Sequence, residues 1–224
     1  MRFGKISYLN LLPFDVFVKQ YPINSSFKLF LNHNKNYPSK LNKEFLFKRI
    51  DAGFISSIAG IKAKKAKSGI ISYGEVWSVI AIPKENKLDY QSASSNALSR
   101  ILKINGEILI GDRALRYKLT GGKCTDLGKI WWDKYHLPFV FGLFCYNNYK
   151  DIYLKLSNAF NKRNIKIPQY ILSKHSSTSG IAKSDIKEYL KHIHYNGAKK
   201  KPQIALNRFY RLVRIERIKV PSRF

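Results

Sequence analysis

The stretch DLGKIWWDKYHLPFVFGLFCY, residues 126–146, indicates the fold class. Its first half has the pattern of an amphipathic helix that stops before Leu137-Pro138. Its second half, residues 139–146, is an apolar run typical of a buried strand. A helix followed by a strand recurs along the chain, and this alternation predicts an α/β fold with mostly parallel sheets.

The alternation extends in both directions from this stretch. We find no internal repeat and no low-complexity linker in the sequence. Strands are predicted up to residue 8 and at 27–33, 51–58, 68–75, 77–83 and 107–110. Helices are predicted at 13–21, 41–49, 59–67, 96–102, 151–162, 183–194 and 202–218.

The 224-residue chain is strongly basic, with 41 Lys and Arg against 14 Asp and Glu and a net charge of +27. Such a charge attracts anions of some kind. The lysines are spread along the whole chain, although the densest basic run lies between Lys199 and Arg223. The chain is also rich in Ile, Asn, Lys, Phe and Tyr, which an AT-rich genome alone produces. We therefore interpret the charge as a solvated basic surface and expect no nucleic-acid partner.

The two cysteines, Cys124 and Cys145, are too few for a disulfide framework, and neither belongs to a CxxC motif. Asn10, Pro13 and Asp15 interrupt the apolar run that a signal peptide needs. No run of about 18 apolar residues exists to span a membrane. These features predict a cytoplasmic protein with no membrane partner.

Small polar residues follow several predicted strands at their carboxyl ends. In open α/β sheets, ligands bind at that end of the strands. We therefore predict one ligand cleft at this edge, although loops are polar in any case. The residues are Asn10, Ser56, Ser57, Ser92, Ser94, Ser95, Gly111 and Asp112.

Two interpretations fit the serines in the stretch KLDYQSASSNALSRIL, residues 87–102. One Ser is enough to cap a helix, because its oxygen accepts a hydrogen bond from a free amide of the first turn. Three hydroxyls beside free amides and the positive end of a helix dipole also suit an anion. The local pattern leaves capping and anion binding open.

Five segments resemble one known family in the same order along the chain. The family is that of chorismate dehydratase, the first enzyme of the futalosine route to menaquinone. DLGKIWWDKYHLPFVFGLF is the most similar segment, whereas Tyr90 and Gln91 replace two hydroxyl residues of the family pattern. The other segments are GKISYLNLLPF at 4–14, DAGFISSI at 51–58, DYQSASSNALSRIL at 89–102 and ILIGDRALRY at 108–117.

The resemblance implies a two-lobed type II periplasmic-binding-protein-like fold with the ligand cleft between the lobes. The large lobe would comprise residues 1–84 and 140–224, and the small lobe residues 85–139. The start of the helix after Ser92 would then face Asn10 across the cleft, which favours the anion-site interpretation of the serines.

The resemblance also implies a reaction, the loss of water from chorismate to give 3-[(1-carboxyvinyl)oxy]benzoate, with no cofactor. Asn10 is the expected catalytic residue, with a helix-capping turn as the alternative. The polar residues at the other strand ends are expected to bind the substrate. The general base stays open between Asp112, which is equally suited to capping a turn, and the enolpyruvyl carboxylate of chorismate itself. No His or Cys spacing indicates a metal, and His192 and His194 are expected to be structural or exposed.

Three other functions are compatible with parts of the sequence. The 1,4-dihydroxy-6-naphthoate synthase of the same pathway shares the fold, but its Ser-Pro-Cys-Pro-Asn-Asp start is absent here. A solute-binding module would bind an aromatic carboxylate without changing it. A nucleic-acid-binding protein would use the C-terminal basic run, but no RNP-type or helix-turn-helix motif accompanies that run.

Overall fold

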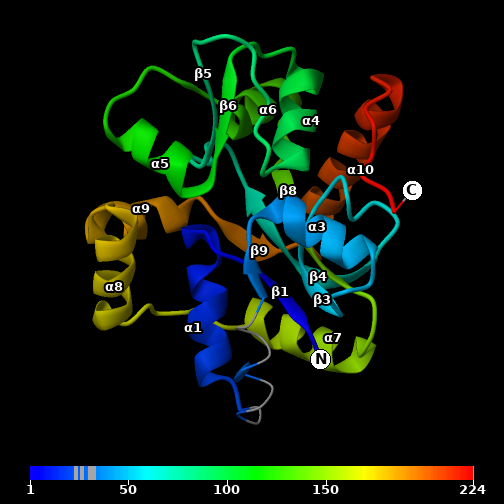
Figure 1. Cartoon of the computed structure of the whole chain (residues 1–224), viewed down its shortest axis with the longest axis vertical. Coiled ribbons are helices and arrows are strands. Elements are labelled where there is room, and N and C mark those ends of the chain that lie inside the picture. Colours follow the sequence, from blue (N-terminus) through cyan, green and yellow to red (C-terminus); the bar gives the residue numbers. More distant parts are fainter. Residues whose placement is uncertain (23–24, 26–27, 30–33, 224) are drawn as a thin grey trace.

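The computed structural model describes residues 1–22, 25, 28–29 and 34–223, whose strands form two sheets of six and three strands. We call the part built on the six-stranded sheet the large lobe and the part built on the three-stranded sheet the small lobe. The small sheet lies above the large one in Figure 1, with α4, α5 and α6 around it. The C-terminal helix α10 contacts both β8 of the large sheet and α4 of the small lobe.

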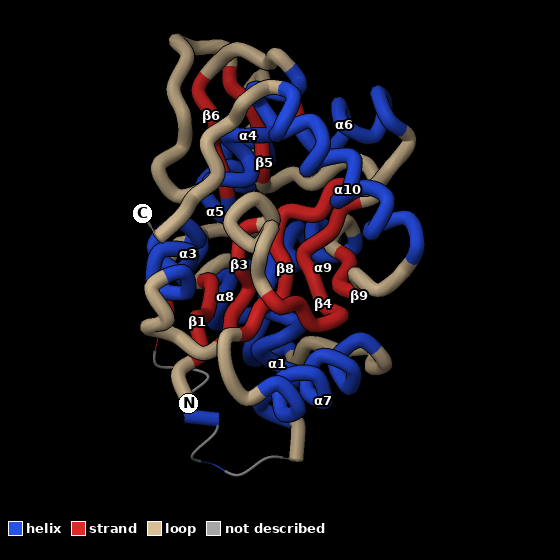
Figure 2. Tube along the Cα trace, turned by 90° about the vertical axis from the view of Figure 1, so that its right-hand side faces the viewer, coloured by secondary structure: helices blue, strands red, loops and turns tan. Residues whose placement is uncertain are grey.

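The large sheet has the strand order β2-β1-β3-β8-β4-β9, and Figure 2 shows β1, β3, β8, β4 and β9 side by side. Its strands are β1 (Phe3–Ile6), β2 (Asn34–Asn36), β3 (Ala52–Ser56), β4 (Lys64–Ser72), β8 (Phe139–Tyr146) and β9 (His194–Asn196). The small sheet has the order β6-β5-β7, with β5 (Val79–Ile82), β6 (Glu107–Ile110) and β7 (Thr125–Asp126).

Helices connect these strands and close the chain. A short 3₁₀ helix, η1 (Leu9–Leu11), directly follows the first strand and leads into α1 (Leu12–Gln20). The others are α3 (Pro38–Leu46), α4 (Ala93–Leu102), α5 (Gly111–Leu119), α6 (Leu127–Tyr135), α7 (Lys150–Asn161), α8 (Gln169–Ser179), α9 (Lys183–Lys191) and α10 (Lys200–Ile215).

The prediction of mostly parallel sheets is wrong. Among the described strands, only β1 is parallel to its neighbours, β2 and β3. Strand β8 is antiparallel to β3 and β4, β4 is antiparallel to β9, and the small sheet is antiparallel. The reason lies in the chain path, because β4 leads out to the small lobe and β8 leads back from it. Two neighbouring strands that carry the chain out and back must run in opposite directions.

The prediction of a helix at 59–67 is also wrong, because β4 already begins at Lys64. The Lys- and Ala-rich segment favours a helix locally, but pairing with β8 aligns Lys64 with Tyr146 and Gly69 with Leu143. Tertiary pairing therefore overrides local propensity. Helices α5 and α8 and strands β2, β7 and β9 were not predicted from the sequence. Of the strand predicted at 27–33, the structure describes only residues 28–29, which are helical rather than extended.

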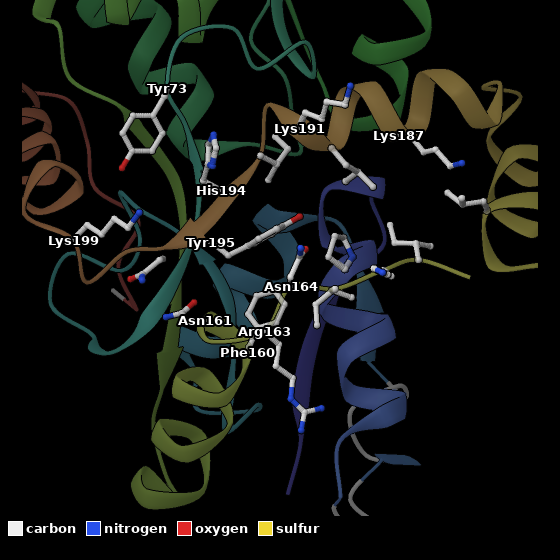
Figure 3. Close-up of a pocket in the computed structure, with 18 residues that line it drawn as sticks. Tyr73, Phe160, Asn161, Arg163, Asn164, Lys187, Lys191, His194, Tyr195 and Lys199 are labelled. Atoms are coloured by element: carbon white, nitrogen blue, oxygen red, sulfur yellow. The ribbon is translucent and has the colours of Figure 1, made fainter. Parts of the chain in front are cut away.

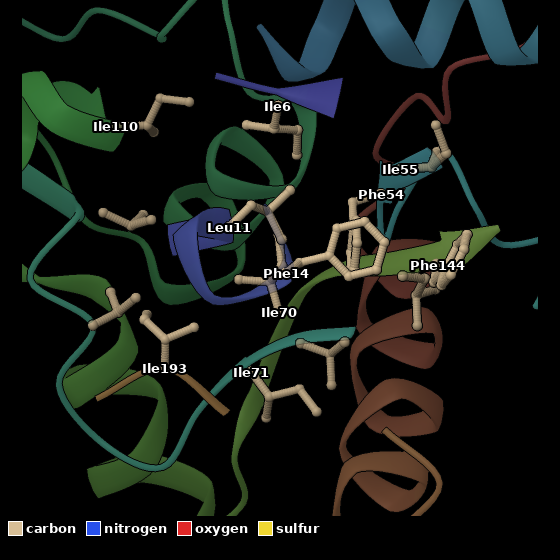
Figure 4. Close-up of a cluster of buried hydrophobic side chains, with 14 of the residues drawn as sticks. Ile6, Leu11, Phe14, Phe54, Ile55, Ile70, Ile71, Ile110, Phe144 and Ile193 are labelled. Carbon is tan, nitrogen blue, oxygen red and sulfur yellow. The ribbon is translucent and has the colours of Figure 1, made fainter. Parts of the chain in front are cut away.

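The core of the large lobe is aromatic. Phe14 of α1 is 2% exposed, and its ring centroid lies 5.1 Å from those of both Phe54 and Phe160. Phe54 stacks on Phe144 at 5.3 Å, and Figure 4 shows these two rings beside Phe14. Together with Phe160 of α7, rings from α1, β3, α7 and β8 form one cluster. This cluster fixes β1 and α1, and therefore the η1 turn between them. No described helix is long and apolar enough to cross a membrane.

Candidate functional site

A small cavity lies between the two lobes, where β1, β3, β4 and β8 meet the start of α4 and the end of β6. Its volume is about 50 Å³, which is room for a few water molecules. The described residues that line it are Ile6, Tyr8, Asn10, Pro38, Ser56, Ile70, Val76, Ser78, Val79, Ser92, Ser95, Ile110, Gly111, Phe141 and Gly142. Five of the eight predicted site residues are therefore brought together here, namely Asn10, Ser56, Ser92, Ser95 and Gly111.

Asn10 provides the clearest sign of a ligand in this cavity. It lies in η1, directly after β1, so the carboxyl end of that strand carries it to the cavity wall. Its side-chain Oδ1 is buried and has no hydrogen-bond partner among the described residues. A buried amide atom without a partner is costly, so its presence indicates a polar ligand or a bound water.

The start of α4 faces the cavity with two serine hydroxyls. The Ser92 Oγ caps the helix by accepting a hydrogen bond from the Ser95 backbone N–H at 3.1 Å, and it lies 2.8 Å from the Ser95 Oγ. Both side chains line the cavity. Capping and exposure to the cavity are thus combined in Ser92. The ten-residue helix also directs the positive end of its dipole here.

Ser57 and Ser94 bind each other rather than the cavity. Their hydroxyl oxygens are 2.9 Å apart, and the Ser94 Oγ also accepts the backbone N–H of Ile58 at 3.2 Å. These contacts join the turn after β3 in the large lobe to α4 of the small lobe. Ser56 does line the cavity, and its Oγ is held by the Nδ2 of Asn42 at 2.7 Å.

Gly111 and Asp112 are the first two residues of α5, but only Gly111 lines the cavity. Gly111 lines the cavity with φ +63°, and a Cβ there would come within 2.8 Å of the Tyr8 ring. Asp112 lies outside the lining. Its carboxylate accepts a hydrogen bond from the backbone N–H of Leu9 at 3.1 Å, and this bond joins the small lobe to the large lobe. Burial raises the pKa of the Asp112 carboxyl to about 6.

Two polar lining residues were missed from the sequence. Tyr8 lies beside the cavity and donates its hydroxyl to the Gln91 Oε1 of the small lobe, and burial raises its pKa above the usual range. Ser78 receives a hydrogen bond from the Tyr189 hydroxyl at 2.9 Å. Tyr8 could have been found, because it precedes Asn10 by two residues at the same strand end. Ser78 could not, because it falls inside a predicted strand.

The cavity lining has no formal charge among the described residues, since it contains no Asp, Glu, Lys, Arg or His. Its polar groups are hydroxyls, one side-chain amide and the backbone at the ends of strands and α4. Such neutral donors bind carboxylates well where a helix N-terminus supports them. The arrangement therefore suits a ligand that has both an apolar body and an anionic group.

Comparison with known proteins places the chain in a family. A family described as menaquinone biosynthesis matches residues 80–214. A chorismate dehydratase from Campylobacter jejuni subsp. jejuni is 40% identical to this chain over 213 residues, which cover 93% of this chain and 96% of that protein. The chain belongs to the menaquinone-biosynthesis family. The resemblance found in the sequence is thereby confirmed.

Solved structures support the fold of this family member at low sequence identity. A protein from Archaeoglobus fulgidus is 14% identical, with a TM-score of 0.69 and coverage of 97% of this chain and 98% of that one. The periplasmic aliphatic sulphonate-binding protein SsuA from Escherichia coli is also 14% identical, with a TM-score of 0.58 and coverage of 100% and 89%. The predicted periplasmic-binding-protein-like fold is confirmed.

The Asp-Leu-Gly motif that this menaquinone-biosynthesis protein carries at 126–128 joins the small lobe to the segment between β4 and β5. The Asp126 carboxylate accepts backbone N–H groups from Val76 at 3.1 Å, Trp77 at 2.7 Å and Lys129 at 3.0 Å. Gly128 packs so closely that a Cβ would come within 2.7 Å of the Gly74 carbonyl oxygen. The motif therefore fixes the path by which the chain enters the small lobe.

A larger groove on the large lobe of the menaquinone-biosynthesis protein has a volume of about 620 Å³ and contains none of the predicted site residues (Figure 3). Its walls come from α7, α9, β9 and the segment after α7, and its cationic side chains are Arg163, Lys166, Lys187, Lys191 and Lys199. Arg163 points away, over the rings of Phe17 and Tyr21. We therefore take the smaller cavity as the candidate site.

No group of three or more His, Cys, Asp or Glu side chains in the described part of the chain could hold a metal. The two histidines considered in the sequence each pack against an aromatic ring. His192 lies 4.4 Å from Trp77 and His194 lies 5.0 Å from Tyr73, measured between ring centroids. Their contacts agree with a structural role.

Proposed function

We propose that this menaquinone-biosynthesis protein is a chorismate dehydratase, a carbon–oxygen lyase that converts chorismate to 3-[(1-carboxyvinyl)oxy]benzoate and water. The observation that carries the proposal is the buried, unpartnered side-chain Oδ1 of Asn10 in the same uncharged cavity as the serines at the start of α4. The 40% identity to a chorismate dehydratase along nearly the whole chain supports it.

The reaction needs little chemical power from the protein. The C3–H bond of chorismate breaks, its electrons form a double bond to C4, and the C4–O bond breaks to release hydroxide, which leaves with the proton as water. Negative charge spreads through the ring diene into the C1 carboxylate before the ring becomes aromatic. The site must therefore hold the ring, stabilise the C1 carboxylate and assist the departing hydroxyl.

We assign these tasks to the residues that line the cavity. Ser92, Ser95 and the first amides of α4 bind a carboxylate, with Ser56 opposite on β3 and Gly111 leaving room for the ring. The unpartnered Asn10 Oδ1 accepts a hydrogen bond from the C4 hydroxyl of the substrate, and the Nδ2 group donates to the carboxylate or to the leaving oxygen.

The predicted residues outside the lining receive a different role in this proposal. Ser57 and Ser94 join the lobes through their hydroxyls, and Asp112 joins them through the Leu9 backbone. We therefore assign Ser57, Ser94 and Asp112 to closing the lobes rather than to contacting chorismate.

We propose that the enolpyruvyl carboxylate of chorismate removes the C3 proton. The described lining offers no carboxylate or imidazole, and Asp112 lies outside it, bound to the Leu9 N–H. A general base must come within hydrogen-bond reach of the proton that it abstracts. The substrate's own carboxylate meets this condition without any titrating side chain.

Chorismate enters only when the lobes separate. Sites for ligands of this kind usually measure about 300–1,000 Å³, whereas the cavity encloses about 50 Å³. We therefore propose that the lobes open to admit substrate and close around it. The predicted boundary at residue 84 falls after β5, which belongs to the small sheet, so we propose that the chain enters the small lobe between β4 and β5 and leaves it near residue 140.

The family is biosynthetic, so we place the proposed reaction in the cytoplasm, at the first step of the futalosine route to menaquinone. The product, an enolpyruvyl benzoate, is the compound that the next enzyme of that route would use.

Incubation of the purified, metal-free protein with chorismate, followed by mass spectrometry, tests the proposal. We expect loss of one water and formation of the enolpyruvyl benzoate, with turnover strongly reduced in Asn10→Ala. Asn164→Ala is a matched control, because Asn164 is exposed in the groove of Figure 3. Unchanged chorismate would refute the proposal, and a thermal shift with chorismate would then indicate a binding module.

A further inference from the structure

The η1 turn that carries Asn10 is held by two side chains from distant parts of the chain. The Tyr195 hydroxyl donates to the Asn10 backbone carbonyl at 2.6 Å, and the Asp112 Oδ1 accepts the Leu9 backbone N–H at 3.1 Å. Within the turn itself, the Leu11 N–H bonds the Tyr8 carbonyl at 3.1 Å. The Tyr8–Leu9 and Asn10–Leu11 peptide groups, one on each side of the Leu9–Asn10 peptide, are thus fixed from outside.

Tyr195 belongs to the large lobe and is firmly placed there. It lies in β9, whose flanking residues Asn196 and His194 pair with Ser68 and Ile71 of β4. Its ring packs on Phe160 at 5.1 Å between centroids and forms part of the groove wall in Figure 3. Burial raises the pKa of Tyr195 well above its usual range, so the hydroxyl stays protonated and remains a donor at neutral pH.

Asp112 belongs to the small lobe, because it lies in the first turn of α5 after the small-sheet strand β6. Its bond to Leu9 therefore crosses the cleft and exists only while the lobes are together. The Tyr195 bond lies within the large lobe and does not depend on closure. The Tyr195 bond therefore holds the turn whether the lobes are open or closed, whereas the Asp112 bond holds it only when they are closed.

We propose that Tyr195 and Asp112 are positioning residues for Asn10, with Tyr195 fixing its turn permanently and Asp112 completing the alignment when the lobes close. The inference rests on the proposed function and deepens it. An amide that must meet charge developing in the transition state loses much of its effect when it is misplaced by about 1 Å. Binding of the substrate depends less on that alignment, because the serines of α4 also hold it.

Tyr195→Phe tests the first half of the proposal, because it removes only the hydroxyl. We expect kcat to fall about tenfold while KM changes less than about twofold, as for one lost hydrogen bond that matters in the transition state. In an Asn10→Ala background the same change should cause no further loss of kcat. Tyr210→Phe is the matched control, because Tyr210 donates to the Ser57 carbonyl at 3.1 Å and lies outside the cavity lining.

Asp112→Asn and Asp112→Ala test the second half. The Asn side chain keeps an acceptor oxygen for the Leu9 N–H, so we expect its kcat to stay within about threefold of wild type. The Ala side chain has no acceptor, and its kcat should fall about tenfold. Equal kcat values for the two variants would overturn this half, and a Tyr195→Phe variant with wild-type kcat would overturn the first.

A spectroscopic readout separates this inference from the proposed function. With ¹⁵N-asparagine labelling, the side-chain NH₂ signals of Asn10 are identified by their loss in Asn10→Ala. Tyr195→Phe should shift or broaden them, whereas Tyr210→Phe should leave them unchanged. If the wild-type protein leaves chorismate unchanged, the proposed function fails, yet these signals still decide whether Tyr195 positions Asn10. Identical Asn10 signals in wild type and Tyr195→Phe would refute the positioning.

Discussion

The carboxylate of Asp126 should be among the most important single groups for the stability of the protein. It is 7% exposed and accepts three backbone N–H groups, two from the segment that enters the small lobe and one from the first turn of α6. One of these donors belongs to Trp77, whose φ of +61° is unusual for a residue other than glycine. Removing the carboxylate leaves these donors without their partner.

The magnitude follows from the number of bonds. An unsatisfied buried donor costs about 1–3 kcal/mol, so Asp126→Ala should lower the free energy of unfolding by about 3–5 kcal/mol. For a chain of this length, that corresponds to a fall in Tm of roughly 6–20 °C. Asp126→Ser keeps a cap for the Lys129 N–H but cannot reach Val76 or Trp77, so it should lose about 2–3 kcal/mol.

Tryptophan fluorescence can report directly on the junction that Asp126 makes between the start of α6 and residues 76–77. All three tryptophans of the chain, Trp77, Trp131 and Trp132, lie in the segments that Asp126 joins, so their fluorescence follows the junction while circular dichroism follows the whole chain. Asp133→Ala is the control, because Asp133 is exposed on the same helix and pairs only with Lys129 among the described residues. The reasoning fails if Asp126→Ala costs less than about 1 kcal/mol, or if the Ser variant is as unstable as the Ala variant.

Three further predictions concern the core, the pH dependence and the charge. Phe14→Ala should cost about 3–5 kcal/mol, because it opens a cavity among the rings of Phe54 and Phe160, and thermal unfolding would show it against a milder Phe14→Leu. Burial raises the pKa of Asp112 to about 6, so the folded state keeps a proton that the unfolded state releases from about pH 4. This group's contribution to the free energy of unfolding therefore falls by about 2 kcal/mol between pH 4 and 6. Urea unfolding of wild type and Asp112→Asn across that range would reveal the difference, and parallel curves would contradict it. The net charge of +27 should attract the chorismate dianion, and salt screens this attraction. Raising the salt concentration from 0.01 to 0.15 M should therefore raise KM for chorismate severalfold and leave kcat unchanged. A fall in kcat would instead indicate a charge at the reacting centre.

The helix and strand at 126–146 could be predicted because their patterns are complete within the sequence. Residues 127–135 form α6 and residues 139–146 form β8, as expected. The direction of β8 could not be predicted in the same way. A hydrophobic run shows that a strand is buried, but only the chain path between the lobes decides whether its neighbours are parallel. The same limit explains β4, where pairing with β8 outweighs the helical preference of a Lys- and Ala-rich segment.

The sequence predicted which element ends meet at the cavity, but not which of their side chains face it. Ser56 is the last residue of β3 and lines the cavity, whereas Ser57 begins the turn that follows, where its hydroxyl meets Ser94. Ser92 and Ser95 are three residues apart at the start of α4 and share a side, whereas Ser94 points toward β3 and binds Ser57. Sequence position identifies the strand end, while the face depends on where each element lies relative to its neighbours.

The contrast between the surface charge and the cavity indicates how the protein divides its work. The surface carries a large excess of Lys and Arg, yet the described lining of the cavity contains no ionisable acid, lysine, arginine or histidine. A buried cation would bind a carboxylate tightly in the ground state and would have to be desolvated for that purpose. Hydroxyls, an amide and the start of a helix avoid this cost, and they can be aimed at charge that appears only during the reaction. Their effect depends on alignment rather than on charge, so under the proposed function we expect the bonds that hold the Asn10 turn to matter as much as the groups that touch the ligand.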